Sequence, residues 1–490
     1  MKKNLLTLGI ASLSLVASLT GCGGVSDLIS SETTSQGTTE SETTSELAEN
    51  EYDGSAVTIK FYHTMSATTL QPTLEKYIAK FNETFPNITV SHEQIGNYDG
   101  VRDQIKTEIA VGSQPNVAYC YPDHVALYNK AKAVQTLDTF INDTGTYTTT
   151  NAAGEQIEYK IGLTQEEQDA FIQGYWDEGK SYGDNLMYTL PFSKSTEVLY
   201  YNKTFFTEHN LTVPTTWDEM WDVCAKIKEI DPKCIPLGYD SAANWFITMT
   251  QQLNSGYTSA TKVNGTNFLF DNETNRAFVA DLKTQYDKGY FTTQGLLGGY
   301  TSSLFVEGAS SDDTKVRSYM SIGSSAGATH QRPTKTDEGT YPFDVGIASI
   351  PQADKTNPKV ISQGPDVVVF KSKNKQQTIA SWLFIKYLTT SVEFQAEFGL
   401  TSGYVPVLKT VAENETYQAA LAKADGGDNI AALSQKVCME QESAYFTSPA
   451  FVGSSTARDQ VGALLEAVIS GSKTIDTAFA DALAECEYSI

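Results

Sequence analysis

The chain has 490 residues and carries 59 acidic against 35 basic side chains, which gives a formal net charge of −24. Nucleic acid and anionic lipid headgroups repel such a surface, so both are excluded as partners. Beyond the amino-terminal segments described next, roughly 430 residues remain, enough for two domains of ordinary size.

The chain begins with the features of a secretion signal. Two lysines precede an apolar stretch at residues 5–19, which is too short for a stable membrane span. The stretch ends in Leu19-Thr-Gly-Cys22, which resembles the bacterial lipobox. The resemblance implies a lipoprotein signal peptide at residues 1–21, a diacylglycerol on Cys22, and a protein held by lipid alone on the extracellular face of the cell membrane. An ordinary signal peptide with an incidental cysteine is the alternative.

A polar segment follows the cysteine. Residues 22–56 are rich in Ser, Thr and Glu and contain no Lys or Arg. Such a composition cannot bury enough apolar surface to offset the entropy of ordering. We therefore predict a disordered tether between the lipid and the folded body.

The body alternates between strand and helix patterns. A strand at 57–62, an amphipathic helix at 70–85 and a strand at 88–95 form a βαβ unit, which favours a parallel sheet. Thr216 and Glu219 have the spacing of a capping box at the start of a helix. The other predicted elements are strands at 116–120, 186–190, 197–201, 316–322 and 367–370, and helices at 104–111, 216–230, 377–388 and 459–469.

Cysteines are few. Besides the proposed lipidation site there are five, an odd number that leaves at least one free thiol: Cys120, Cys224, Cys234, Cys438 and Cys486. Cys224 and Cys234 are close enough in sequence to be bridged, and the sequence does not decide whether they are. No CxxC motif or Cys/His cluster suggests zinc. We expect neither a metal nor a cofactor.

Four blocks of the body occur in a familiar order: Lys60-Phe-Tyr-His63, Ala79-Lys-Phe-Asn-Glu-Thr-Phe-Pro-Asn87, Leu199-Tyr-Tyr-Asn-Lys203 with Pro214-Thr-Thr-Trp-Asp-Glu219, and Gly403-Tyr-Val-Pro-Val407. In this they resemble the family 1 extracellular solute-binding proteins of bacterial ABC importers. The resemblance implies an α/β, two-lobed periplasmic-binding-protein-like fold of type II, whose discontinuous lobes close on a ligand about a hinge. It also implies a monomer that is not an enzyme and that delivers a small polar ligand to permease subunits.

The same resemblance gives expected boundaries for the lobes. Lobe I would comprise residues 57–165 and 358–402. Lobe II would comprise residues 166–357 and 403–490.

Within the family, the chain is similar to the branch that binds sn-glycerol-3-phosphate. The residues that match the ligand contacts of this branch are Tyr98, Asp123, Ser195, Trp245, Ser324, Gly364, Tyr404 and Arg458. An arginine fork suits a phosphate or carboxylate, serines complete the shell of an anion, and aromatic rings pack on a sugar or glycerol. Each residue also has a structural interpretation; Trp245, for example, could lie in the core.

Three departures from the branch leave the ligand open. Phe61-Tyr-His63 stands where the branch has Phe-Trp-His. Asp123 stands where the branch has a glutamate, so its reach is shorter. Lys194 has no counterpart there and would add a second cation beside Ser195. A neutral mono- or oligosaccharide therefore remains an alternative ligand.

One motif suggests catalysis. Gly323-Ser-Ser-Ala-Gly327 fits the G-x-S-x-G pattern of α/β hydrolases, which need an acid and then a histidine downstream. Only His330 follows, with no acidic residue before it. A secreted hydrolase acting on a glycoside or ester, and a surface adhesin, remain the alternatives to a solute-binding protein.

Overall fold

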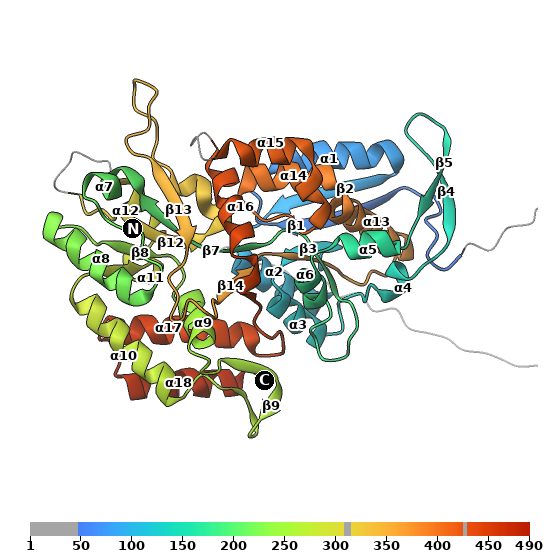
Figure 1. Cartoon of the computed structure of the whole chain (residues 1–490). Helices are drawn as coiled ribbons and strands as arrows, with labels where there is room; N and C mark the ends of the chain where they lie inside the picture. Colours follow the sequence, from blue (N-terminus) through green and yellow to red (C-terminus); the bar gives the residue numbers. More distant parts are fainter. Residues whose placement is uncertain (1–47, 308–314, 425–428) are drawn as a thin grey trace, which may run out of the picture. The chain divides into compact units, whose positions relative to one another are not determined.

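The computed structural model describes residues 48–307, 315–424 and 429–490 (Figure 1). The predicted signal peptide and Cys22 lie outside the described residues, as does most of the predicted tether. The described residues form one compact unit, and none of their helices is long and apolar enough to cross a membrane.

The first of two main sheets contains the predicted βαβ unit. Its strand order is β2 (Ile88–Gln94), β1 (Val57–His63), β3 (Val117–Cys120), β15 (Asp366–Val369) and β6 (Thr189–Pro191). Strand β1 pairs in parallel with β2 and β3, which confirms the predicted parallel pairing. Strand β15 is antiparallel to both of its neighbours.

The second sheet is built around one long buried strand, β7 (Ser195–Asn202). Its order is β11 (Phe291–Thr293), β8 (Leu237–Tyr239), β12 (Met320–Ser324), β7, β14 (Val360–Gln363) and β16 (Tyr445–Phe446), and β13 (Val345–Ser349) also pairs with β7. Two separate hairpins are formed by β4 (Thr146–Thr150) with β5 (Gln156–Lys160), and by β9 (Thr258–Val263) with β10 (Thr266–Phe268).

Helices occupy most of the remaining chain. Up to β6 they are α1 (Gln71–Thr84), α2 (Tyr98–Val111), α3 (Pro122–Lys130), α4 (Asp138–Ile141), α5 (Gln165–Ala170) and α6 (Gln173–Glu178). Between β7 and β12 they are α7 (Lys203–Glu208), α8 (Trp217–Ile230), α9 (Ala242–Gln252), α10 (Glu273–Asp287), α11 (Gln294–Leu297) and α12 (Ser302–Val306). After β15 they are α13 (Lys375–Thr390), α14 (Val392–Ser402), α15 (Glu415–Ala422), α16 (Ile430–Glu440), α17 (Ser454–Ile469) and α18 (Ile475–Tyr488). The predicted capping box at the start of α8 is present.

Each sheet has its own apolar core. Phe61, Leu74 and Trp382 belong to the core of the first sheet, whereas Leu199 and Trp245 belong to the core of the second. The molecule is therefore an α/β protein with two lobes, as the fold class predicted. The lobe boundaries stay a prediction, although strand pairing places β6 with the first sheet and β14 with the second.

The chain crosses directly between the sheets from β6 to β7 and from β14 to β15. The two crossings pack backbone against backbone. Gly364 has a φ of +110°, and a Cβ atom there would lie 2.7 Å from the carbonyl oxygen of Ser193. This approach requires glycine. Val405 joins the crossings through a bridge with Lys194, whose N–H donates to the Val405 oxygen at 3.0 Å.

Lys194 is buried at this junction and does not lie in the ligand site. Its ammonium pairs with Glu178 and, at 2.7 Å, with Asp366. Burial opposes the charge, but the two carboxylates outweigh it and raise the pKa of Lys194. The expectation that Lys194 adds a second cation to the ligand site is therefore wrong. Its charge is compensated by Glu178 and Asp366 where the chain crosses between the sheets.

The structure also decides whether Cys224 and Cys234 form a disulfide. All five in the described residues are buried free thiols, so Cys224 and Cys234 are not bridged. Burial raises the pKa of the Cys234 thiol to about 12.

Candidate functional site

A cavity of about 750 Å³ lies between the two lobes. Tyr98 of α2 and Tyr121, just before α3, line it from the side of the first sheet, and Tyr404 lines it just after α14. The second sheet and its helices contribute polar groups. The cavity is within the size range of small-molecule sites.

The floor of the cavity is set by strand register. Glu197 of β7 pairs with Ser324 of β12, and Ser195 of β7 pairs with Gln363 of β14. Residues two apart on a strand point to the same face, as do directly paired neighbours. All four line the cavity. The second sheet therefore presents a contiguous polar floor made from three adjacent strands.

Tyrosines form the opposite wall. The Tyr98 ring stacks on Tyr121 with 4.3 Å between centroids and 25° between planes, and the hydroxyls of Tyr98 and Tyr404 are 2.8 Å apart. Asn97 caps α2 by accepting a hydrogen bond from the backbone of Gly100, which explains the Gly-Asn-Tyr sequence. Burial raises the pKa of Tyr98 well above its usual value. The wall therefore stays neutral and offers ring faces with hydroxyl tips.

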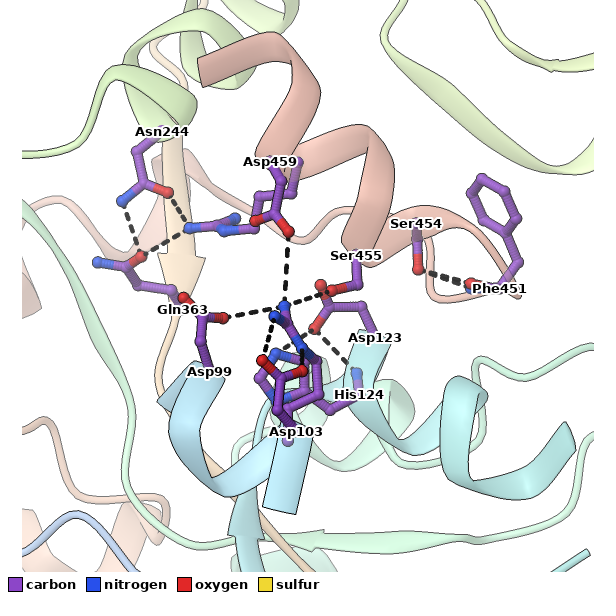
Figure 2. A network of polar contacts seen from close by, with 12 residues as sticks. Asp99, Asp103, Asp123, His124, Asn244, Gln363, Phe451, Ser454, Ser455 and Asp459 are labelled. Carbon is purple, nitrogen blue, oxygen red and sulfur yellow. Dashed lines mark hydrogen bonds and ion pairs between the residues drawn. The ribbon is translucent and has the colours of Figure 1, made fainter. Parts of the chain in front are cut away.

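Arg458 of α17 supplies a cation at the side of the cavity. Its guanidinium donates to the amide oxygens of Asn244 and, at 3.5 Å, Gln363, and these two amides are themselves joined at 2.8 Å (Figure 2). It also lies 5.9 Å from the centre of the Tyr121 ring. In the described part of the chain no carboxylate forms an ion pair with Arg458. Because only neutral oxygens hold it, the fork keeps its charge for an anion or a strong acceptor.

Glu197 is a cavity residue that the sequence interpretation missed. Its side chain is buried, with the residue 1 % exposed, and its Oε2 accepts a hydrogen bond of 2.5 Å from the Tyr239 hydroxyl. Burial raises the pKa of Glu197 to about 7. The sequence signal was present: Glu197 is the one charged residue of an otherwise apolar and neutral polar strand, Ser-Thr-Glu-Val-Leu-Tyr-Tyr-Asn.

Asp240 is a second carboxylate at the cavity, just beyond β8. Its Oδ1 accepts hydrogen bonds of 2.7 Å from both the backbone and the hydroxyl of Thr301. Burial raises the pKa of Asp240. Asp240 thus fixes the start of α12 at the rim of the cavity.

The structure brings most of the predicted site residues together. Five of the eight line the large cavity: Tyr98, Ser195, Ser324, Tyr404 and Arg458. Asp123 and Gly364 line an adjoining cavity of about 50 Å³, which shares Tyr121, Gln363 and Arg458 with the large one.

Trp245 lines neither cavity. It is fully buried and stacks on Tyr239 with 4.3 Å between centroids and 8° between planes. On helix α9 its neighbour Asn244 faces the cavity, and successive helical positions diverge by about 100°. The expectation of Trp245 as a ligand contact is therefore corrected: the ring supports the cavity from behind.

Residues 76–424 match the family described as bacterial extracellular solute-binding protein. The chain belongs to this family. This solute-binding protein is 25% identical over 435 residues to the sn-glycerol-3-phosphate-binding periplasmic protein UgpB of Salmonella typhimurium, covering 86% of this chain and 90% of that protein. It is 24% identical over 380 residues to UgpB of Escherichia coli K12, covering 76% and 79%.

Solved structures of binding proteins share its fold. UgpB from Mycobacterium tuberculosis in complex with glycerophosphocholine superposes with a TM-score of 0.68 and 16% identity, covering 88% of this chain and 98% of that one. Maltose-bound MalE3 of T. maritima gives a TM-score of 0.67 and 15% identity, covering 89% and 100%. Lmo0181 from Listeria monocytogenes, in complex with cycloalternan, gives 0.69 and 16%, covering 88% and 98%.

Proposed function

We propose that this solute-binding protein captures a carbohydrate-type solute in the large cavity and delivers it, unaltered, to the permease of an ABC importer. The solute is a sugar, an oligosaccharide or an sn-glycerol-3-phosphate-like compound. The observation that carries the proposal is the pairing of a tyrosine wall from one lobe with a polar floor and Arg458 from the other. Such a site is complete only when both lobes contact the same molecule.

The chemistry of the lining supports a polyol. Ring faces pack on the C–H surfaces of a sugar or glycerol, while hydroxyls, amides and carboxylates bond its OH groups. Arg458 suits a phosphate or a sugar oxygen. The relatives named glycerol-3-phosphate-binding proteins, and the maltose-bound and glycerophosphocholine-bound structures, support the same class of solute.

The proposed location rests on the sequence. The lipobox-like ending at Cys22 and the polar tether after it support a lipoprotein on the extracellular face of the membrane. The tether would let the body move between solute and permease. Radiolabelled palmitate incorporation in wild type and its loss in Cys22→Ser would test the anchor.

A hydrolase has no support from the G-x-S-x-G motif. The central serine, Ser325, is fully buried, and its hydroxyl accepts a hydrogen bond of 3.2 Å from the backbone of Thr196. A nucleophile elbow instead exposes its serine at a strand-to-helix turn. The motif here shapes the turn after β12.

A thermal-shift screen tests the proposal. The panel is glycerol-3-phosphate, glycerophosphocholine, maltose and maltotriose, each followed by mass spectrometry of the recovered compound. A compound at a hundredfold excess over its Kd stabilises the folded state by about 2.7 kcal/mol. We expect at least one member to raise the melting temperature and to be recovered intact. No stabilisation by any member, or recovery of a cleaved product, would refute the proposed function.

A further inference from the structure

Glu197 is a buried carboxylate in the cavity, and the contacts of Arg458 and the tyrosines give it no role in binding. It lies in the middle of the cavity floor, directly opposite Ser324 and two residues from Ser195 on the same face of β7. A carboxylate in a central buried strand is costly unless donors satisfy it. The Tyr239 hydroxyl donates to Oε2, and the Asn244 amide also bonds the carboxylate.

Arg458 attracts this carboxylate across the cavity without forming an ion pair with it. Among the described residues no Lys, Arg or His nitrogen pairs with Glu197. Arg458 lines the same cavity but is held by the amides of Asn244 and Gln363. The cavity thus holds a partly buried cation and a buried carboxylate that do not pair with each other. Groups arranged in this way are complementary to a molecule that has an acceptor at one position and donors at another.

We propose that Glu197 is a specificity-determining residue: its carboxylate accepts hydrogen bonds from hydroxyls of the solute while Arg458 binds an acceptor or anionic group of the same molecule. This rests on the proposed function and deepens it. Tyr239 is then a positioning residue that orients the carboxylate from behind, and Trp245 holds the Tyr239 ring by stacking.

The charge balance of the lining narrows the solute class. Arg458 contributes one positive charge, and Glu197 and Asp240 contribute two acidic groups. A phosphate monoester with nearly two negative charges meets a net repulsion in such a low-dielectric site. A neutral sugar meets no such repulsion, nor does glycerophosphocholine, whose quaternary ammonium cancels the charge of its phosphodiester and which has free glycerol hydroxyls. The sugar and the phosphodiester both carry vicinal hydroxyls that can donate hydrogen bonds to Glu197.

The Glu197 carboxylate also makes the affinity for the solute depend on pH. The charged and titratable groups that face it are Tyr239 and Asp240 from β8 and its end, and Arg458 from α17; β12 and β14 face it with the neutral Ser324 and Gln363. Burial raises the pKa of Glu197 to about 7. Hydroxyl donors favour the ionised form, so binding lowers this pKa and releases protons near neutrality. Affinity therefore rises from pH 6 to pH 8 and levels off above.

Calorimetric titration of the full mature chain tests this inference. Maltose, maltotriose, glycerophosphocholine and glycerol-3-phosphate are titrated at pH 7 in two buffers of different ionisation enthalpy, which counts released protons. The variants are Glu197→Gln and, as a matched control, Glu208→Gln on the exposed end of α7. We expect proton release in wild type and the control. In Glu197→Gln we expect none, together with affinity that is weaker by about tenfold or more. Glycerol-3-phosphate should bind more weakly than glycerophosphocholine.

The outcomes separate the two proposals. If wild type binds a panel member without proton release and Glu197→Gln binds it equally well, the inference is overturned and the proposed function stands. If no member binds wild type, the proposed function fails. Should Glu197→Gln fail to fold by circular dichroism, Tyr239→Phe replaces it. That variant keeps the ring stack and removes the donor, and its affinity profile should shift to higher pH; an unchanged profile would overturn the inference.

Discussion

Arg102 is the residue whose removal tests lobe closure most sharply. It lies on α2 of the first lobe and reaches α17 of the second, the helix that also carries Arg458. Its Nη1 donates to the Ser455 hydroxyl at 3.1 Å and lies 3.5 Å from the Asp459 carboxylate. Asp99 and Asp103 hold the same guanidinium from its own helix. Figure 2 shows these acidic groups and Ser455 gathered around one guanidinium.

The magnitude of this contact follows from its exposure. The Asp459 side chain is 55% exposed, so its pair with Arg102 is worth no more than about 1 kcal/mol. The hydrogen bond to Ser455 adds about 1 kcal/mol. If both contacts exist only when the lobes are closed, Arg102→Ala shifts the equilibrium toward the open state by about 1–2 kcal/mol, a factor of about 5–30.

The assay combines calorimetry with small-angle X-ray scattering. Arg102→Ala should bind a stabilising panel compound about 5–30-fold more weakly and show a larger radius of gyration at subsaturating ligand. The difference from wild type should shrink at 1 M salt, because an exposed pair is screened. Lys106→Ala, exposed on the same helix, is the control. Equal affinity and equal scattering for Arg102→Ala and wild type would show that the contacts of Arg102 with Ser455 and Asp459 do not stabilise the closed state.

Three further substitutions have defined outcomes. Arg458→Ala should cost about 2–5 kcal/mol of binding in calorimetry with little change in apo melting temperature; unchanged affinity would remove it from the site. Lys194→Met leaves two buried carboxylates without their cation and should lower the free energy of unfolding by about 3–5 kcal/mol in denaturant titrations, with an effect below 1 kcal/mol contradicting the buried triad. Gly364→Ala places a Cβ atom 2.7 Å from the Ser193 oxygen at a φ of +110° and should destabilise by about 1–3 kcal/mol or prevent folding; a neutral substitution would show that the crossings do not pack so closely.

Local sequence patterns predicted most elements because neighbours along the chain decide them. The capping box fixed the start of α8, and apolar spacing located α1 and α13. The strand predicted at 316–322 instead begins at Met320. Before Met320 the backbone contacts are isolated hydrogen bonds, from the Asn202 N–H to the Tyr319 oxygen and from the Ile235 N–H to the Arg317 oxygen. Regular pairing begins where Met320 faces Leu237, the first residue of β8. Helix α2 begins at Tyr98, earlier than the predicted 104, because Asn97 caps it.

Long-range contacts account for what the sequence did not predict. Lys194 resembled a ligand cation because its two buried partners, Glu178 and Asp366, are far away in the chain. Strand alternation placed Glu197 on one face of β7 but could not tell whether that face meets a cavity or a core. Trp245 is one helical position away from Asn244, and only the packing against Tyr239 shows that it faces inward.

A crystal structure of the mature protein grown with the most stabilising panel compound would show whether one solute contacts both lobes. We expect the intact compound in the large cavity, with an acceptor on Arg458, hydroxyls on Glu197 and a face against Tyr98 or Tyr121. Density for a cleaved product, or an intact compound bound outside this cavity, would contradict it.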